Sequence, residues 1–216
     1  MNDRHWIDAV PEPKRAFGDL AEAIRAFLKT ASTVSPVSDL PPAQAETSVA
    51  GYRKAAEQGF AKAQYVLGLC FKNGWVLQKD HQQMVYWFRK AAEQGFAKAQ
   101  YNLALCYNDG DGVPQDYQQA VYWFRKASEQ GFARAQYSLA RRYANGEGVQ
   151  KDLEQAVSWY RKAAEQGDAR SQYALGFCYY NGWGVSKDYQ QAVYWTRKAA
   201  EQGEEDAKKA LKALGY

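Results

Sequence analysis

The side chains of this sequence that could perform acid, base or metal chemistry are few and widely separated. Its histidines, His5 and His81, have no neighbours at the spacing of a catalytic or metal-binding motif. The stretch NDGDGVPQD, residues 108–116, faintly resembles a calcium-binding loop but lacks the glycine placement and the distal glutamate of such a loop. We therefore expect no enzyme activity, no catalytic residue, no cofactor and no metal site.

Three cysteines, Cys70, Cys106 and Cys178, are separated by multiples of 36 residues, and Arg142 stands at the intervening multiple. An odd number of cysteines does not make the paired framework of a secreted disulfide-rich domain. Equivalent positions on packed neighbouring helices lie about 9 to 10 Å apart, whereas a disulfide needs Cα atoms within about 7 Å. We predict free thiols that act as small buried hydrophobic residues.

The composition is that of a folded domain with a sizeable core, since 46% of the 216 residues are hydrophobic and 24% are charged. The net charge is +4, but lysine and arginine alternate with glutamate, so we expect no nucleic acid partner. No apolar stretch approaches the roughly 18 residues of a membrane span. Charge and proline near residue 1 leave no signal-peptide core, and we expect a cytoplasmic location unless the natural leader is missing.

The chain repeats itself every 36 residues without insertion or deletion. The first full copy, AAEQGFAKAQYVLGLCFKNGWVLQKDHQQMVYWFRK, starts at Ala55. The later copies start at Ala91, Ala127 and Ala163, and a partial copy starts at Ala199. A period of 20 to 50 residues indicates stacked supersecondary units, each too small to bury its own apolar face.

Each unit has the pattern of two helices. Apolar residues recur at helical spacing from about Phe96 to Asn108 and again after Asp116. Asp116 and its equivalents have the position of an N-cap, with glutamine three residues later as in a capping box. Gly59, Gly95 and their equivalents follow the second helix, where a left-handed backbone favours glycine.

The pattern A-x-A-x-x-x-L-G/A-x-x-Y-x-x-G-x-G-V-x-x-D-x-x-x-A-x-x-W-Y/F-x-K-A-A-x-x-G resembles the Sel-one-like repeat, a relative of the tetratricopeptide repeat, over about residues 52–216. The resemblance implies an all-α fold, a right-handed α-solenoid of helix-turn-helix repeats. One departure is Val76, where later copies have glycine, as in Gly112. If that position needs positive φ, valine is strained there, and we predict a remodelled loop at residues 73–80.

We predict four segments along the chain. Residues 1–32 hold an amphipathic helix that caps the first repeat, docks on a partner or, least favoured, lies on a membrane surface. Residues 33–50 are a linker and the start of a partial repeat, residues 51–198 a solenoid and residues 199–216 a C-terminal capping helix. The four full repeats are 55–90, 91–126, 127–162 and 163–198.

Near-identical copies are most informative where they differ. On the first helix of each unit, three positions within about 60° of one another vary, while the opposite arc repeats. These twelve residues, the variable stripe, are Lys62, Val66, Leu69, Lys98, Asn102, Leu105, Arg134, Ser138, Arg141, Arg170, Ala174 and Phe177. Since first helices line the concave side of a solenoid, we expect the stripe to form a groove with a basic rim.

The leading hypothesis is a non-catalytic scaffold that binds a helix or extended peptide with acidic and apolar side chains in this groove. Arg141 and Arg142 are expected to grip a carboxylate with bidentate hydrogen bonds. One alternative is that the stripe residues differ between copies only through sequence drift on a face exposed to solvent. Another is an inhibitor dedicated to one toxin or effector, such as an immunity protein or a chaperone. The resemblance also allows a β-lactam-binding or hydrolysing protein, which no residues support. The oligomeric state is left open.

Overall fold

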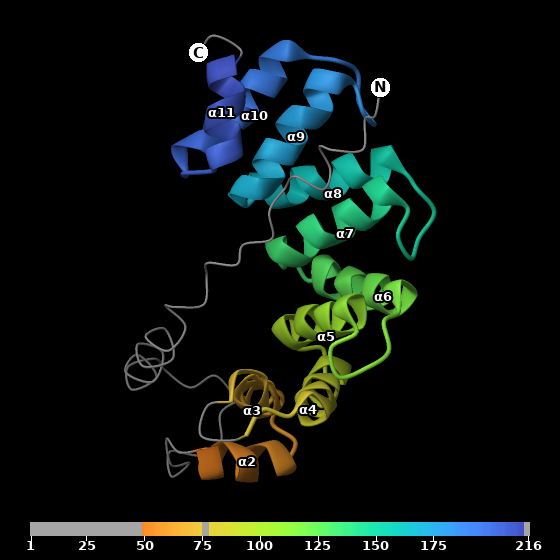
Figure 1. Cartoon of the computed structure of the whole chain (residues 1–216), viewed down its shortest axis with the longest axis vertical. Helices are drawn as coiled ribbons and strands as arrows, with labels where there is room; N and C mark the ends of the chain where they lie inside the picture. Colours follow the sequence, from red (N-terminus) through yellow and green to blue (C-terminus); the bar gives the residue numbers. More distant parts are fainter. Residues whose placement is uncertain (1–48, 75–77, 214–216) are drawn as a thin grey trace. The chain divides into compact units, whose positions relative to one another are not determined.

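The computed structural model describes residues 49–74 and 78–213, and within these ranges every regular element is an α-helix (Figure 1). The helix expected within residues 1–32, most of the linker, and Val76 in the loop predicted to be remodelled lie outside the described residues.

Four helical hairpins follow one another along the chain, as the period predicts. Their first helices are α3 (Ala61–Asn73), α5 (Ala97–Asp109), α7 (Ala133–Asn145) and α9 (Ala169–Asn181). Their second helices are α4 (His81–Glu93), α6 (Tyr117–Glu129), α8 (Leu153–Glu165) and α10 (Tyr189–Glu201). The shorter helices α2 (Val49–Glu57) and α11 (Glu205–Ala213) flank them.

The helix boundaries follow from the capping residues that the sequence indicates. The Asp116 carboxylate accepts hydrogen bonds from the backbone N–H groups of Gln118 and Gln119, and Asp80, Asp152 and Asp188 cap their helices in the same way. After the second helices, Gly95 and its equivalents have positive φ, which reverses the chain toward the next hairpin.

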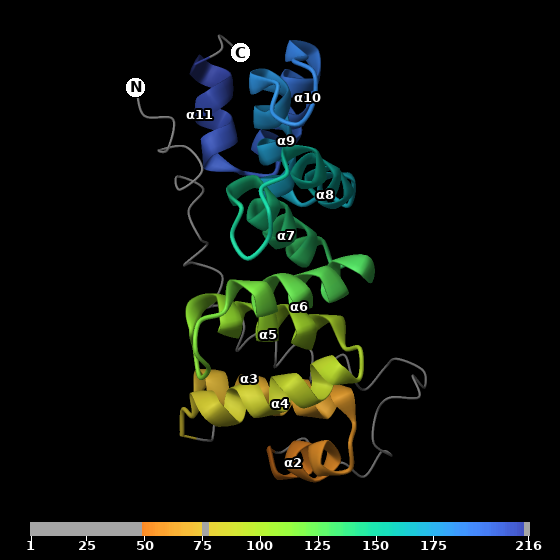
Figure 2. The ribbon, with the colours of Figure 1, turned by 90° about the vertical axis from the view of Figure 1, so that its right-hand side faces the viewer.

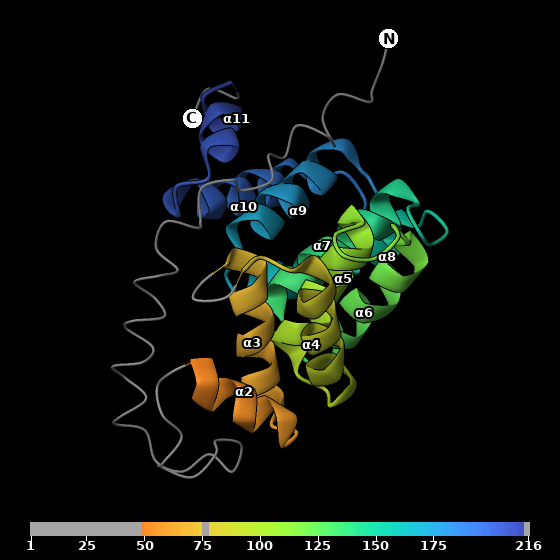
Figure 3. The same ribbon diagram turned by 60° about the horizontal axis from the view of Figure 1, so that its bottom comes forward.

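Each helix packs against the helices that precede and follow it, so the hairpins form one stack. The two helices of each hairpin lie side by side, and the hairpins follow one another along the stack from α2 to α11 (Figure 2). Figure 3 shows that successive hairpins are rotated, so that α9 and α10 run across the direction of α3 and α4. This is the α-solenoid fold that the sequence predicts.

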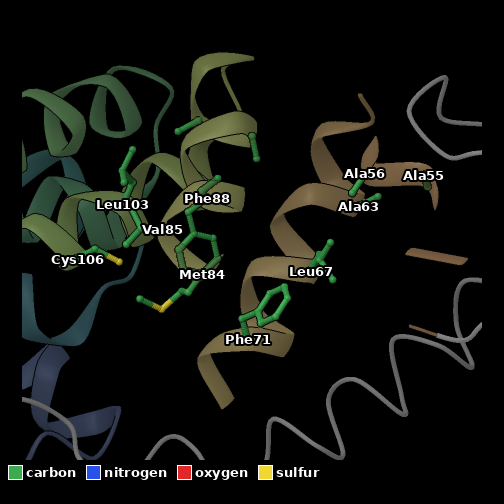
Figure 4. Close-up of a cluster of buried hydrophobic side chains, with 13 residues drawn as sticks. Ala55, Ala56, Ala63, Leu67, Phe71, Met84, Val85, Phe88, Leu103 and Cys106 are labelled. Carbon is green, nitrogen blue, oxygen red and sulfur yellow. The ribbon is translucent and has the colours of Figure 1, made fainter. Parts of the chain in front are cut away.

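The core is a series of clusters of buried side chains within and between the hairpins. Leu67, Met84 and Phe88 are fully buried in the first of these clusters (Figure 4). A Cβ atom added at Gly68 would lie 2.6 Å from the Phe88 ring, so glycine lets the two helices of this hairpin approach closely.

A relay of buried glutamines joins consecutive helices. The Gln100 side chain donates to the Ala92 carbonyl oxygen at 3.1 Å and accepts a hydrogen bond from Gln130 at 2.7 Å. Gln64, Gln136 and Gln172 make the equivalent pairs of bonds. The relay explains the glutamine that each copy keeps in its AQ or SQ sequence and in its EQG sequence, because a buried amide needs partners at both ends.

The inter-helix loops interlock with the preceding hairpin. Gly148 has φ +70°, and Gly146, two residues before it, has φ +77°. The backbone of Gly148 lies against the carbonyl oxygen of Tyr117, which a Cβ atom at position 148 would overlap. Gly112 and Gly184 make the same contact with the first residue of the preceding second helix. Glycine is therefore needed at this position both for the backbone conformation and for the close approach.

At the C-terminal side, α11 packs on α10 through Ala207, which is fully buried. Lys208, Lys209 and Lys212 on the same helix are exposed, as the substitution of lysine into the repeat pattern predicts. Within residues 49–74 and 78–213, no helix has the length and apolar character that a membrane crossing requires.

Candidate protein-interaction surface

The variable stripe is accessible to solvent along all four first helices. Lys98 and Arg134 are exposed, and the ten other stripe residues are partly exposed. Positions that repeat in every copy behave oppositely, since Leu67, Leu103, Leu139 and Leu175 are all fully buried. The division between constant and variable positions in the sequence is therefore a division between core and surface.

Side chains from neighbouring repeats meet across this surface. The Tyr65 hydroxyl on α3 hydrogen-bonds the Asn102 side chain on α5; burial raises the Tyr65 pKa, and this bond and the Arg134 charge on α7 oppose the rise.

Tyrosines beside the stripe join neighbouring hairpins. The Tyr65 ring lies 5.8 Å from the Phe88 ring and 5.2 Å from the Phe96 ring of the next repeat. Tyr101 repeats this arrangement. These tyrosines are therefore packing residues whose rings are held in place next to the variable side chains.

The third repeat carries polar residues where its neighbours are apolar. Arg142 occupies the cysteine position, has 8% of its surface exposed, and forms an ion pair with Glu147. Its guanidinium also lies 5.5 Å from the centre of the Tyr117 ring. Burial lowers the Arg142 pKa, and Glu147 opposes this effect. The prediction that Arg142 grips a partner's carboxylate is therefore wrong, because its side chain is buried and its charge is paired within the repeat.

Arg170, a basic residue of the stripe, has an acidic neighbour. Its guanidinium lies 3.3 Å from the Asp168 carboxylate and 4.5 Å from the centre of the Tyr137 ring. Asp168 replaces the phenylalanine of earlier copies and caps α9 by accepting a hydrogen bond from the Ser171 N–H. The other basic residues of the stripe are Lys62, Lys98, Arg134 and Arg141.

The variable stripe does not include the inter-helix loops, which hold a further variable position. In the last three full repeats, the residue between the two loop glycines is Asp111, Glu147 or Trp183, and these pair with His81, Arg142 and the stripe residue Phe177 respectively. The sequence contains a signal for this position, because in these three copies the residue changes while the glycines on both sides of it do not. The loops therefore add a variable residue to each repeat.

The cysteines are free and buried, which confirms the predicted thiols. Burial raises the pKa of Cys106 to about 12 and that of Cys178 to about 12. Such thiols are neutral near pH 7 and are poor nucleophiles or metal ligands. In the part of the chain that the structure describes, no group of three or more His, Cys, Asp or Glu side chains is arranged to hold a metal ion.

Comparison with known families identifies the repeats. The model of the Sel1 repeat matches residues 52–60, 61–96, 97–132, 133–168 and 169–204. The chain belongs to the Sel1 repeat family. No curated protein matches the chain. The Sel1 repeat is generally a non-catalytic scaffold, and this fold supports a protein-interaction role.

Solved Sel1 repeat structures have the same fold. A protective antigen with an SLR fold, present in uropathogenic Escherichia coli strains, is 43% identical with a TM-score of 0.76 and aligns with 78% of this chain. A Sel1 repeat protein from Oxalobacter formigenes is 40% identical with a TM-score of 0.71 over 77% of this chain. This chain spans 36% and 66% of those two chains.

A more distant structure is the immunity protein PA5088 from Pseudomonas aeruginosa. It is 26% identical, with a TM-score of 0.50, and the alignment covers 85% of this chain and 66% of that one.

Proposed function

We propose that this Sel1 repeat protein is a non-catalytic scaffold whose variable stripe binds a protein or peptide partner. The observation that carries the proposal is the accessibility of all twelve variable positions on adjacent first helices, beside constant positions that are buried. A surface whose residues change from repeat to repeat over an unchanged core suits the recognition of a partner with its own irregular sequence.

The chemistry of the stripe favours a partner with acidic and apolar side chains. Lys62, Lys98, Arg134 and Arg141 supply positive charge, and carboxylates are their natural partners. Between them lie apolar residues, among them Leu69, Leu105 and Phe177, each partly exposed. The free buried thiols fit a reducing compartment, so we expect to find the partner in the cytoplasm.

The proposal is tested by affinity purification with matched charge reversals. The stripe variant Lys98→Glu with Arg134→Glu changes exposed residues in the first turns of α5 and α7, where a carboxylate favours the helix. The control Lys90→Glu with Lys126→Glu makes the same change in net charge on the second helices α4 and α6.

We expect the partner recovered with the wild type to bind the control and to bind the stripe variant at least about tenfold more weakly. Thermal unfolding of all three proteins checks that each is folded. Equal binding of the stripe variant and the wild type would instead support variation by drift on a solvated face.

A dedicated inhibitor is the second candidate. The similarity to the immunity protein PA5088 supports this possibility without indicating a partner. If the protein is an inhibitor, affinity purification from the native cell should recover one tightly bound protein. If it is a scaffold, the same purification should recover several components of a complex. No feature of the described residues favours the β-lactam alternative.

A further inference from the structure

Exposed tyrosines recur on the second helices. Tyr86, Tyr122 and Tyr194 occupy the same position of their repeats, and 48%, 50% and 48% of their surfaces are exposed. The third repeat has Ser158 at this position. Packing therefore does not require tyrosine there, since the third hairpin folds with serine. These tyrosines are exposed and yet nearly constant, whereas the residues of the variable stripe differ from copy to copy.

Two of the tyrosines have the same ordered surroundings. The Tyr86 ring packs edge-to-face on the Trp87 ring with centroids 4.9 Å apart, and the Lys90 ammonium lies 5.8 Å from the centre of the Tyr86 ring. On α6, Tyr122 has the equivalent two neighbours at the same two distances. A ring that is already held in place loses little entropy when a partner covers it.

The tyrosines of α4 and α6 belong to one surface, because their tryptophan neighbours, Trp87 and Trp123, pack against the same core cluster. Ser158 interrupts the row before Tyr194 on α10. We call the exposed side of α4 and α6 the outer face. Its residues, all exposed, are Gln83, Tyr86, Lys90 and Glu93 on α4 and Gln119, Tyr122, Lys126 and Glu129 on α6.

The outer face carries charges of both signs. Lys90 and Glu93 form no ion pair with another residue of the ranges 49–74 and 78–213. Arg89, by contrast, donates a hydrogen bond to the Tyr107 hydroxyl oxygen of the next hairpin at 2.9 Å, so its side chain joins repeats. Each helix of the outer face thus presents glutamine, tyrosine, lysine and glutamate in that order, and the last two supply its available charges.

A second copy of this chain matches that order when its helices run antiparallel to those of the first. A twofold axis that runs along the stack, within the interface, makes α4 face α4 of the second copy and α6 face α6. With residue 88 at the centre, Tyr86 lies opposite Lys90 of the second copy, and Gln83 lies opposite Glu93. The same register holds on α6 because the repeats have equal length. Every contact then joins a cation with a ring, or a carboxylate with an amide.

The parallel arrangement of two copies lacks this complementarity. A twofold axis along the helices would make α4 face α6 of the second copy. Lys90 would then lie opposite Lys126, and Glu93 would lie opposite Glu129. Since like charges placed opposite one another disfavour association, the charges of the outer face select the antiparallel arrangement.

We propose that the outer face is an interface between two copies of this chain, in which α4 and α6 of one copy pack antiparallel on α4 and α6 of the other. The inference does not rest on the proposed function, because the variable stripe belongs to the first helices. The dimer would present two stripes. Since two helices on each side make a small interface, we expect a dissociation constant on the order of 10–100 µM.

Sedimentation equilibrium of the full chain, from about 5 µM to about 500 µM, tests the proposal across the expected range. Tyr86→Ser with Tyr122→Ser gives the outer face the serine of the third repeat, and Tyr194→Ser makes the same change on α10 as the control. We expect the wild type and the control to dimerise alike and the outer-face variant to dimerise at least about tenfold more weakly. A wild type that stays monomeric, or equal association of all three proteins, would overturn the proposal.

A charge substitution tests the direction of the helices. Gln83→Lys with Gln119→Lys places a new ammonium group opposite Glu93 and Glu129 in the antiparallel dimer, which should tighten association about threefold or more. In the parallel dimer the new lysines would face each other, so weaker association would overturn the antiparallel arrangement. Thermal unfolding checks that each variant is folded.

The two surfaces are separated by comparing self-association with partner binding. Lys90→Glu with Lys126→Glu should weaken self-association and retain the partner, whereas Lys98→Glu with Arg134→Glu should do the reverse. Failure of the stripe variant to lose its partner would then count against the proposed function alone. If Tyr86→Ser with Tyr122→Ser lost the partner while its sedimentation matched the wild type, the outer face would be a site for that partner, and the dimer interface would be overturned.

Discussion

Position 142 shows how one residue changes the chemistry of a repeat without changing its fold. The equivalent residues Cys70, Cys106 and Cys178 are small and neutral, whereas Arg142 brings a charge to the same buried place. Its charge is balanced by Glu147 from the following loop. The Arg142 side chain is buried and that of Glu147 is partly exposed, so removal of Glu147 leaves a buried charge uncompensated.

Glu147→Gln is therefore expected to lower the free energy of unfolding by about 1–3 kcal/mol, because Arg142 stays buried without its carboxylate. Adding Arg142→Cys, which restores the residue of the other repeats, should recover most of that loss. Denaturant unfolding of the wild type, both single variants and the double variant measures the coupling. Additive effects of the two changes would show that the pair does not act as a unit.

The buried thiols make a second prediction at the scale of the residue. With the pKa of Cys106 raised to about 12, its thiolate is rare at pH 8, and reaction with an aromatic disulfide reagent should be about 100-fold slower than in denaturant. The denatured protein, with all three thiols reactive, is the control. Rapid reaction of the folded protein at pH 8 would contradict the described burial.

The raised pKa values of buried groups also determine how the free energy of unfolding depends on pH. Cys106, Cys178 and Tyr137 each have a pKa raised to about 12 in the folded chain, mainly by burial. A raised pKa means that the folded state retains its proton longer than the unfolded state. The free energy of unfolding should therefore be constant with respect to these groups below about pH 8 and fall as the pH rises toward 12. Denaturant midpoints measured between pH 7 and pH 11 check the direction.

At the scale of the element, the positive-φ glycines that follow the second helices and those in the inter-helix loops are required for different reasons. Gly131 follows a second helix and has open space where a Cβ atom would stand. Gly148 lies in an inter-helix loop and faces the Tyr117 carbonyl oxygen of the preceding hairpin. Only the second kind joins two elements, although both have the same sign of φ.

Gly131→Ala is expected to cost about 1 kcal/mol, from backbone strain alone. Gly148→Ala should cost at least about 2 kcal/mol more, because its Cβ atom also forces the loop away from α6. Thermal and denaturant unfolding of the two variants compare the costs directly. Equal costs would mean that the contact between loop and helix contributes nothing beyond the backbone conformation.

At the scale of the whole molecule, each described hairpin packs mainly against its neighbours, so stability is close to a sum of repeat and interface contributions. A defect in an inner repeat then weakens two interfaces and separates the repeats on either side. A defect in the fourth repeat leaves the three earlier repeats in contact with one another.

Leu139 and Leu175 occupy the same position in the third and fourth repeats, and both are fully buried. Replacement of either by alanine should cost about 2–5 kcal/mol locally. We expect faster amide hydrogen exchange on both sides of α7 for Leu139→Ala, and exchange confined to α9, α10 and α11 for Leu175→Ala. The same exchange pattern in both variants would show that the stack unfolds as a single unit.

The sequence by itself determined the helical hairpins, their boundaries and the buried positions, because helical periodicity, capping aspartates such as Asp116 and terminal glycines such as Gly95 act locally and recur in each copy. It also separated the variable stripe from the core, since packing restricts what a core position can hold. The sequence did not show that Arg142 is buried while its neighbour Arg141 stays partly exposed. The burial of Arg142 depends on the direction in which the helix points each side chain and on the ion pair with Glu147 from the next loop.

Only the tertiary structure decided which residues distant in the sequence meet. The contact of Gly148 with Tyr117, the hydrogen bond between Tyr65 and Asn102 of the next repeat, and the pairing of Trp183 with Phe177 all depend on how the helices pack as the hairpins stack. That rotation is set by the packing of complete side chains between helices, which a local pattern does not encode.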